Sequence, residues 1–183
     1  MVGIDGSRLK ALVIEDNPHF RLLIRTVLQT LGISQVEEAR DGADGWQHLQ
    51  RFHADFVIAD WKMEPMNGLT FSRKIRHAEN SPNRFLPIIM VTGYSELSLV
   101  AEARDAGVNE FLTKPISARS LVGRIVSVIT APRPFVEAGD YFGPDRRRRQ
   151  HPVQGEDRRK KKSEFLPNAA RVSHIVSGGN GGR

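Results

Sequence analysis

Residues 56–68 read FVIADWKMEPMNG: four apolar residues, an aspartate, and a turn through Pro65, Asn67 and Gly68. The apolar run predicts a short buried strand, and the Pro, Asn and Gly that follow it are typical of a loop. Asp60 stands where that strand ends. Because a buried carboxylate is costly unless a partner offsets its charge, the pattern indicates a site that needs a negative charge at this point.

Strand and helix patterns alternate on both sides of this stretch. Short apolar runs predict strands at residues 10–14, 36–39, 56–59, 87–91 and 108–112. Apolar residues at helical spacing predict helices at residues 17–31, 43–52, 69–77, 96–106 and 117–129. Five strand–helix units in succession predict an α/β fold, in which a five-stranded parallel sheet is covered by helices on both faces.

The composition changes after residue 130. Residues 132–183 contain twelve Lys or Arg and six Asp or Glu, whereas residues 1–131 contain fifteen of each, so the net charge of +6 belongs to the C-terminal part. This part is rich in Pro, Gly and Arg, and the segment GPDRR at 143–147 is echoed by GEDRR at 155–159. We therefore expect a folded domain over residues 8–130 and an extended or disordered basic tail over residues 131–183.

Composition also excludes several classes of protein. The chain has no cysteine, which excludes disulfides, thiolate metal sites and thiol catalysis. It has no apolar run of roughly 18 residues, so no membrane span is predicted. Its first residues, MVGIDGSRLK, lack the apolar core of a signal peptide. These features predict a cytoplasmic protein.

Polar residues gather where the predicted strands end. Carboxylates, one hydroxyl and one ammonium follow four of the strands: Glu15, Asp16, Asp60, Thr92 and Lys114. Ligands of open parallel sheets bind beyond this edge, and clustered carboxylates repel one another unless a cation neutralises them. With oxygen ligands and no Cys or His, the predicted cation is Mg²⁺. A carboxylate beside Mg²⁺ can attack phosphorus to form an acyl phosphate, while Lys114 and Thr92 hold the phosphoryl oxygens.

Residues 8–130 resemble the receiver domain of chemotaxis-type response regulators. The resemblance rests on residues that match in order and spacing: the acid pair Glu15-Asp16, Asp60 within DWKMEPMNG, Thr92 within VTGY, and Lys114-Pro115 within FLTKP. It implies a doubly wound, flavodoxin-like fold. The Arg-rich GPDRRRR segment is similar to tails of stand-alone receivers in alphaproteobacteria.

The resemblance implies a phosphoacceptor with a Mg²⁺ site. Asp60 would accept a phosphoryl group from a histidine kinase or a histidine phosphotransferase. Asp16 would bind Mg²⁺ directly, Glu15 would bind it through water, and Asp60 and the backbone carbonyl of Lys62 would be further ligands. The chain would therefore not be a classical enzyme, since it would only catalyse its own phosphorylation and dephosphorylation.

The resemblance also implies a switch. Lys114 would grip the phosphoryl group, Thr92 would move toward it, and Phe111 would turn inward as the switch aromatic. The peptide bond before Pro115 would be cis. Two details depart from common forms of the family: Glu64 stands where Pro is frequent, and Phe111 replaces Tyr and so has no hydroxyl. Trp61, next to the acceptor, is expected to be exposed.

Signalling would then pass through protein–protein contact. The expected surface is the fourth helix, fifth strand and fifth helix, at residues 95–106 and 111–129. The basic tail could be solvated charge or could dock on an acidic protein surface. An alternative function is a nucleic-acid-binding regulator that acts through this tail and is gated by the receiver. A phosphatase on a similar fold is disfavoured, because Lys62 occupies the position where such enzymes carry a general-acid Asp.

Overall fold

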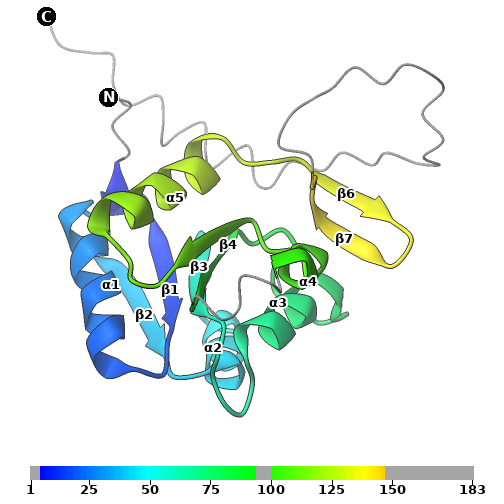
Figure 1. Ribbon diagram of the computed structural model, residues 1–183, viewed down its shortest axis with the longest axis horizontal. Helices are drawn as coiled ribbons and strands as arrows, with labels where there is room; N and C mark the ends of the chain where they lie inside the picture. Colours follow the sequence, from blue (N-terminus) through cyan, green and yellow to red (C-terminus); the bar gives the residue numbers. More distant parts are fainter. Residues whose placement is uncertain (1–4, 94–99, 147–183) are drawn as a thin grey trace, which may run out of the picture.

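The computed structural model describes residues 5–93 and 100–146. Its strands are β1 Lys10–Ile14, β2 Gln35–Ala39, β3 Phe56–Asp60, β4 Ile88–Thr92, β5 Glu110–Thr113, β6 Phe135–Ala138 and β7 Tyr141–Pro144. Its helices are the 3₁₀ turn η1 Gly6–Arg8, α1 Pro18–Thr30, α2 Gly42–Leu49, α3 Gly68–His77, α4 Val100–Asp105 and α5 Ala118–Thr130. Strands β1 to β5 form one parallel sheet in the order β2-β1-β3-β4-β5 (Figure 1). This is the order of doubly wound, flavodoxin-like folds, as expected.

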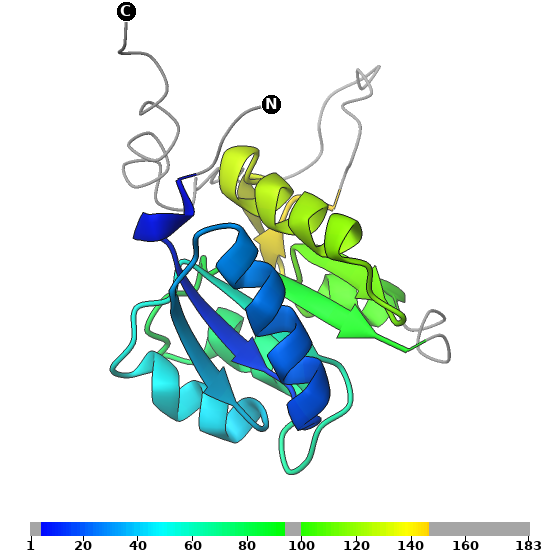
Figure 2. The same ribbon diagram turned by 90° about the vertical axis from the view of Figure 1, so that its left-hand side faces the viewer.

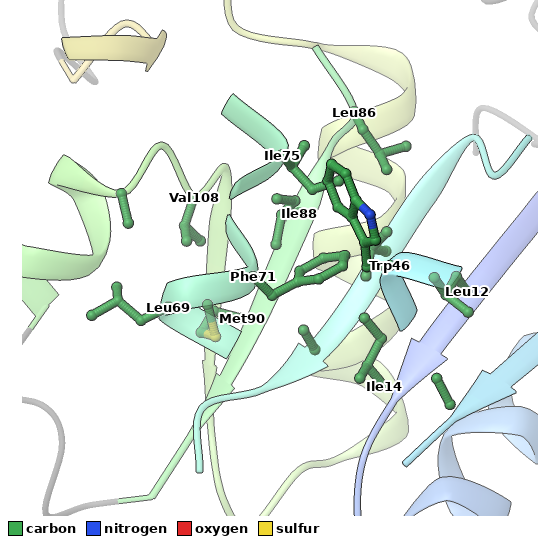
Figure 3. Packing of buried hydrophobic residues seen from close by; sticks show 14 of the residues in the cluster. Leu12, Ile14, Trp46, Leu69, Phe71, Ile75, Leu86, Ile88, Met90 and Val108 are labelled. Carbon is green, nitrogen blue, oxygen red and sulfur yellow. The ribbon is translucent and has the colours of Figure 1, made fainter. Parts of the chain in front are cut away.

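Two hydrophobic clusters lie on the two faces of this sheet. The helices on both sides of the sheet are seen in Figure 2. Alternate residues of β1 point to opposite sides, so that Leu12 and Ile14 belong to one cluster and Val13 to the other. On the first side Trp46 of α2 and Phe71 of α3 fill the core, together with side chains of the central strands (Figure 3). Helices α1 and α5 cover the second side. Strands buried on both faces explain the nearly continuous apolar runs of the sequence.

The helices begin and end at residues that the sequence marks. The side chain of Asn17 accepts hydrogen bonds at the N-terminus of α1, whose first residue is Pro18. Asn67 caps α3 and Ser117 caps α5 in the same way. Gly32, with φ +78°, follows α1 in the left-handed conformation. The expected start of the fourth helix, at residue 96, lies outside the described residues.

Residues after α5 form a β-hairpin. Strands β6 and β7 pair antiparallel, and Gly139 in the turn has φ +59°. The prediction of an extended or disordered tail is therefore wrong for the hairpin. The hairpin lies beside α3 and α4, on the side of the molecule opposite α1 and β2 (Figure 1). The remainder of the predicted tail, from residue 147, lies outside the described residues.

Aromatic rings hold the hairpin on the receiver. Phe135 and Phe142 are buried, and the ring centroid of each lies 5.3 Å from that of Phe85, in edge-to-face contact. The guanidinium of Arg76 lies 5.0 Å from the Phe135 ring, and that of Arg84 lies 4.0 Å from the Phe142 ring. Both arginines precede β4, so the hairpin is packed on residues of the domain itself.

Backbone and charge contacts complete the attachment. Arg133, before the hairpin, donates to the backbone oxygens of Asn109 and Asp145. Arg146, after it, forms an ion pair of 2.9 Å with Asp105 at the end of α4. Among residues 5–93 and 100–146, no helix combines the length and the apolar character that crossing a membrane requires.

Candidate functional site

The polar residues that follow the predicted strands do meet at one edge of the sheet. Glu15 and Asp16 follow β1, while Asp60 is the last residue of β3. One carboxylate oxygen from each of the three lies within 4.8 Å of the others. Glu15 and Asp60 are buried, and Asp16 is exposed. The predicted carboxylate cluster is thus present, with two acids beneath and one at the surface.

Lys114 reaches this cluster from the loop after β5. Its ammonium nitrogen lies 2.8 Å from Oδ1 of Asp60 and 3.2 Å from Oε2 of Glu15. Its backbone N–H donates to the backbone oxygen of Thr92 at 2.7 Å, which fixes the loop to the end of β4. The Lys114–Pro115 peptide bond is cis, as expected. One ammonium therefore bridges two buried carboxylates at the ends of different strands.

Burial and charge set the protonation of these groups. Burial, reinforced by the charge of Asp60, raises the pKa of Glu15 to about 7. Burial also raises the pKa of Asp60, although Lys114 works in the opposite direction. Burial alone would lower the pKa of Lys114, but its two carboxylate partners outweigh this effect and raise it. The three carboxylates of the site together thus carry more negative charge than the Lys114 ammonium neutralises.

The donor set fits a hard divalent cation. Every side-chain ligand in the cluster is a carboxylate oxygen, and two of the three acids have raised pKa values because their charges are buried close together. A divalent cation would remove this repulsion, and carboxylates with water are the usual ligands of Mg²⁺. Lys62, whose carbonyl is a predicted ligand, lies two residues after Asp60, and its side chain is exposed. The ligand role of this carbonyl stays a prediction.

Thr92 ends β4 beside this cluster. Its side chain is buried, and its hydroxyl is a buried polar atom without a hydrogen-bond partner among the described residues. Buried hydroxyls normally have partners, so this one indicates a group that the site accepts. Phe111 of β5 is half-buried and packs against the cluster that contains Trp46. Its role as a switch stays a prediction.

Trp61 differs from its expected environment. Only 6% of its surface is exposed, and it belongs to the hydrophobic cluster of the α2 and α3 side. The expectation of an exposed indole is wrong, because the chain keeps following the sheet at this residue: the Trp61 N–H donates to Val91 O, and its carbonyl accepts from Gly68 N–H.

Two residues near the site are not predicted by the strand-end pattern, and both lie in the first turns of α1. The ammonium of Lys114 lies 4.5 Å from the ring centroid of Phe20. Arg21 donates to the backbone oxygen of Glu15 at 2.6 Å and to the Glu38 carboxylate at 3.0 Å. The available signal was that α1 starts directly after the acid pair, which places its first turn at the same edge of the sheet.

Comparison with known proteins identifies the family of the folded domain. Residues 11–126 match the family described as the response regulator receiver domain. The chain belongs to this family. The receiver is 32% identical over 121 residues to the chemotaxis protein CheY-3 of Vibrio cholerae. The matched residues cover 66% of this chain and 92% of that protein. It is also 32% identical over 120 residues to the chemotaxis protein CheY of Pseudomonas aeruginosa, covering 66% and 95%.

Solved structures agree with this assignment. The receiver resembles the chemotaxis response regulator CheY4 of Vibrio cholerae with a TM-score of 0.60 and 28% identity, over 66% of this chain and 98% of that one. A receiver domain from a sensor histidine kinase of Pseudomonas aeruginosa PAO1 matches with a TM-score of 0.56 and 28% identity, over 65% and 94%. That structure is described with a magnesium ion coordinated in its active-site cleft.

Membership of the family settles the class of function. The chain carries a receiver domain of a two-component response regulator of the CheY type, a family typically phosphorylated on aspartate. Receiver domains bind Mg²⁺ at an acidic site and interact with histidine kinases and downstream targets; they are generally not classical enzymes. The family match does not favour the alternative of a nucleic-acid-binding regulator.

Proposed function

We propose that this receiver accepts a phosphoryl group on Asp60 in a Mg²⁺-dependent reaction, from a histidine kinase or a histidine phosphotransferase. The observation that carries the proposal is the 2.8 Å contact between Asp60 and the Lys114 ammonium, within the cluster that Glu15 and Asp16 complete. Asp60 is the last residue of the central strand β3, where a phosphodonor can approach beyond the sheet edge.

The Asp60 carboxylate acts as the nucleophile. One of its oxygens forms a bond to phosphorus while the bond from phosphorus to the donor's imidazole nitrogen breaks, and the electron pair of that bond returns to the nitrogen. Lys114 supports this step twice: its charge favours the ionised carboxylate against burial, and its N–H groups then bind a phosphoryl oxygen. Phosphorylation converts a carboxylate into an acyl phosphate on the same side chain.

Mg²⁺ would be held by Asp16 and Asp60, by Glu15, and by the backbone carbonyl of Lys62. When bound, the ion supplies positive charge that neutralises the carboxylates and the phosphoryl oxygens. This chain's own contribution is to keep the carboxylates together: the Glu15 side chain accepts from Lys114 and from the backbone N–H of Asn17, at 3.2 Å each.

Thr92 couples the presence of the phosphoryl group to a conformational change in the rest of the domain. Its unpartnered hydroxyl gains a hydrogen-bond acceptor when a phosphoryl oxygen arrives, which favours a conformation with Thr92 closer to the site. Phe111 then fills the space that Thr92 leaves. The new conformation is read by a downstream protein through α4, β5 and α5, and the basic C-terminal segment adds a dock for an acidic partner surface.

Phosphorylation of the full chain by a small phosphodonor tests the assignment of Asp60. The purified protein is incubated with Mg²⁺ and phosphoramidate, and intact-mass spectrometry measures the gain of one phosphoryl group. Asp60→Asn is expected to abolish the gain, since an amide is not a nucleophile here. Asp55→Asn is the matched control, because Asp55 lies just before the opposite end of the same strand and is only half-buried.

The outcome would contradict the proposal if Asp60→Asn still gained one phosphoryl group per chain, or if the wild type gained none while folded. Repeating the reaction with a chelator in place of Mg²⁺ tests the requirement for the metal separately from the identity of the acceptor residue. We expect labelling to stop in the chelator and to return when Mg²⁺ is restored.

A further inference from the structure

Phe20 lies against the ammonium of Lys114. The Lys114 nitrogen is 4.5 Å from the centre of the Phe20 ring, within the range of a cation–π contact. The same nitrogen lies 2.8 Å from Asp60 and 3.2 Å from Glu15. The ammonium therefore has two carboxylates and one aromatic ring around it, and the ring comes from α1, which contributes no charged group to this contact.

The ring itself is held in place from two directions. The backbone N–H of Phe20 donates to the capping side chain of Asn17 at 3.2 Å, which fixes the first turn of α1. The ring is half-buried and packs against the hydrophobic cluster under α1 and α5. The next residue, Arg21, binds the backbone oxygen of Glu15 at 2.6 Å. Phe20 is thus a rigid surface beside a flexible four-carbon side chain.

An aromatic ring acts on an ammonium differently from a carboxylate. Its electron-rich face attracts the positive charge but offers no strong hydrogen-bond acceptor, so the N–H groups of Lys114 remain available for oxygen atoms. A third carboxylate in the same place would compete with an incoming phosphoryl group for those donors. The ring also shields one side of the ammonium from water, which strengthens its attraction for the oxygens in the site.

We propose that Phe20 is a positioning residue for phosphoryl transfer, whose ring face holds the Lys114 ammonium between Glu15 and Asp60. The proposal rests on the proposed function of Asp60. Its consequence is that the aromatic character of residue 20, and not only its bulk, sets the rate at which Asp60 is phosphorylated. Bulk alone would predict that a large aliphatic side chain serves equally well.

Substitutions that separate ring from bulk test this. Phe20→Leu and Phe20→Met keep an apolar side chain without a ring, and we expect either to slow labelling of Asp60 by phosphoramidate by roughly 2- to 30-fold, the range of a cation–π contact. Phe20→Tyr keeps the ring face and should restore the rate to near the wild-type value. Phe52→Leu is the matched control, since the Phe52 ring also faces a lysine, Lys10 at 5.8 Å, away from the site.

A spectroscopic readout tests the contact between the ring and the ammonium independently of phosphorylation. In the wild type, the ring current of Phe20 should shift the ε-methylene resonance of Lys114 upfield in a spectrum of lysine-labelled full-length protein. The shift should vanish in Phe20→Leu and Phe20→Met and persist in Phe20→Tyr and Phe52→Leu. Circular dichroism confirms that each variant is folded, and with two ringless variants one failure to fold does not decide the result.

Two outcomes overturn the inference: a ringless variant labelled at the wild-type rate, or a Lys114 resonance that keeps its upfield shift without the ring. Failure of the proposed function looks different. In that case the wild type itself is not labelled, or Asp60→Asn is labelled, and the Lys114 resonance still reports whether the ring contacts the ammonium.

Discussion

At the scale of single residues, the site combines groups that would be unfavourable one at a time. Glu15 is 1% exposed and Asp60 is 6% exposed, yet both accept from one ammonium at the end of Lys114. A buried carboxylate costs free energy unless it is paired, and one cation cannot fully offset two. The residual repulsion favours binding of a metal ion and, after it, a phosphoryl group.

Replacement of Glu15 by Gln tests this repulsion. The pKa of Glu15 is raised from 4.5 to about 7, so the folded state binds more protons than the unfolded state between these values. The contribution of Glu15 to stability without metal should therefore be greatest below pH 4.5 and should fall as the pH rises to about 7. Glu15→Gln removes the titrating group, and we expect it to unfold at a higher temperature than the wild type at pH 8 in a chelator.

The exposed acid Glu79 provides the control, since Glu79→Gln should follow the wild-type profile. Addition of Mg²⁺ should raise the unfolding temperature of the wild type at pH 8, and should raise that of Glu15→Gln by less, because a ligand that binds the folded state more tightly stabilises it more. A difference in unfolding temperature between the wild type and Glu15→Gln that stays constant between pH 4.5 and pH 7 would contradict the electrostatic account.

Thr92 gives a second prediction at this scale. Its buried hydroxyl has no partner among the described residues, so replacement by the isosteric Val removes an unsatisfied group. We expect Thr92→Val to stabilise the unphosphorylated protein by about 1 kcal/mol in chemical denaturation, and to slow labelling of Asp60. Thr113→Val is the control, because Thr113 is exposed and is paired with Thr92 in the register of β4 and β5. Loss of stability in Thr92→Val would mean that the hydroxyl has a partner in solution.

At the scale of elements, the sequence predicts the site because strand ends coincide with changes of residue type. The apolar runs at β1, β3 and β4 each stop at a polar side chain, and parallel strands bring those stops to one edge. The spacing of an α/β chain therefore carries three-dimensional information about Glu15, Asp60 and Thr92. The spacing does not predict the contact of the Phe20 ring with Lys114, because an aromatic residue in an amphipathic helix is predicted to pack in the core whatever else it contacts.

The junction between β3 and α3 gives a prediction for an element. A Cβ added to Gly68, the first residue of α3, would lie 2.2 Å from the backbone oxygen of Asp60. Gly68→Ala must therefore push the helix away from the strand that carries the acceptor. We expect a loss of at least about 1–3 kcal/mol in the free energy of unfolding, together with slower labelling of Asp60.

Gly123 within α5 is the matched control, because an added Cβ there meets nothing within 4 Å. Gly123→Ala should stabilise the protein by about 0.5–1 kcal/mol through helix propensity alone. Equal effects of the two substitutions would show that α3 can shift without cost, and that the close contact of Gly68 with Asp60 does not constrain the site.

At the scale of the whole molecule, the hairpin extends the folded unit beyond the last helix of the receiver. Arg76 is the centre of its attachment: the side chain is fully buried, donates to the carbonyls of Gly107 and Arg84 and to the Asn109 side chain, and stacks on Phe135. Each of these acceptors belongs to a loop of the receiver. The hairpin therefore covers an arginine that the receiver alone would leave partly open.

The packing of the hairpin on Arg76 could not be predicted from the sequence, for physical reasons. Each hairpin strand has four residues, and Phe135 and Phe142 are its two buried aromatic residues, which is too little periodicity to distinguish a strand from a Pro- and Gly-rich loop. Arg76 lies in the basic last turn of α3, where arginine is expected in solvent. Only the tertiary contacts show that Arg76 is buried and that the Phe135 ring packs on it.

Replacement of Phe135 by Ala tests the energetic weight of the hairpin. The substitution removes a fully buried ring from Phe85 and Arg76, so we expect a loss of about 3–5 kcal/mol in the free energy of unfolding of the full chain. Glu137→Ala, at an exposed position of the same strand, should change it by less than about 0.5 kcal/mol. Equal stabilities for the two variants would show that the hairpin adds nothing to the fold.

The central claim is that Asp60 becomes an acyl phosphate, and chemical trapping tests it most directly. The full chain is phosphorylated in Mg²⁺, reduced with borohydride, which converts an aspartyl phosphate to homoserine, and mapped by peptide mass spectrometry. The account predicts homoserine at position 60, and no other, in a yield that falls to background when Mg²⁺ is chelated. Homoserine at Asp16 or elsewhere, or a stable phosphoryl group on another side chain, would contradict it.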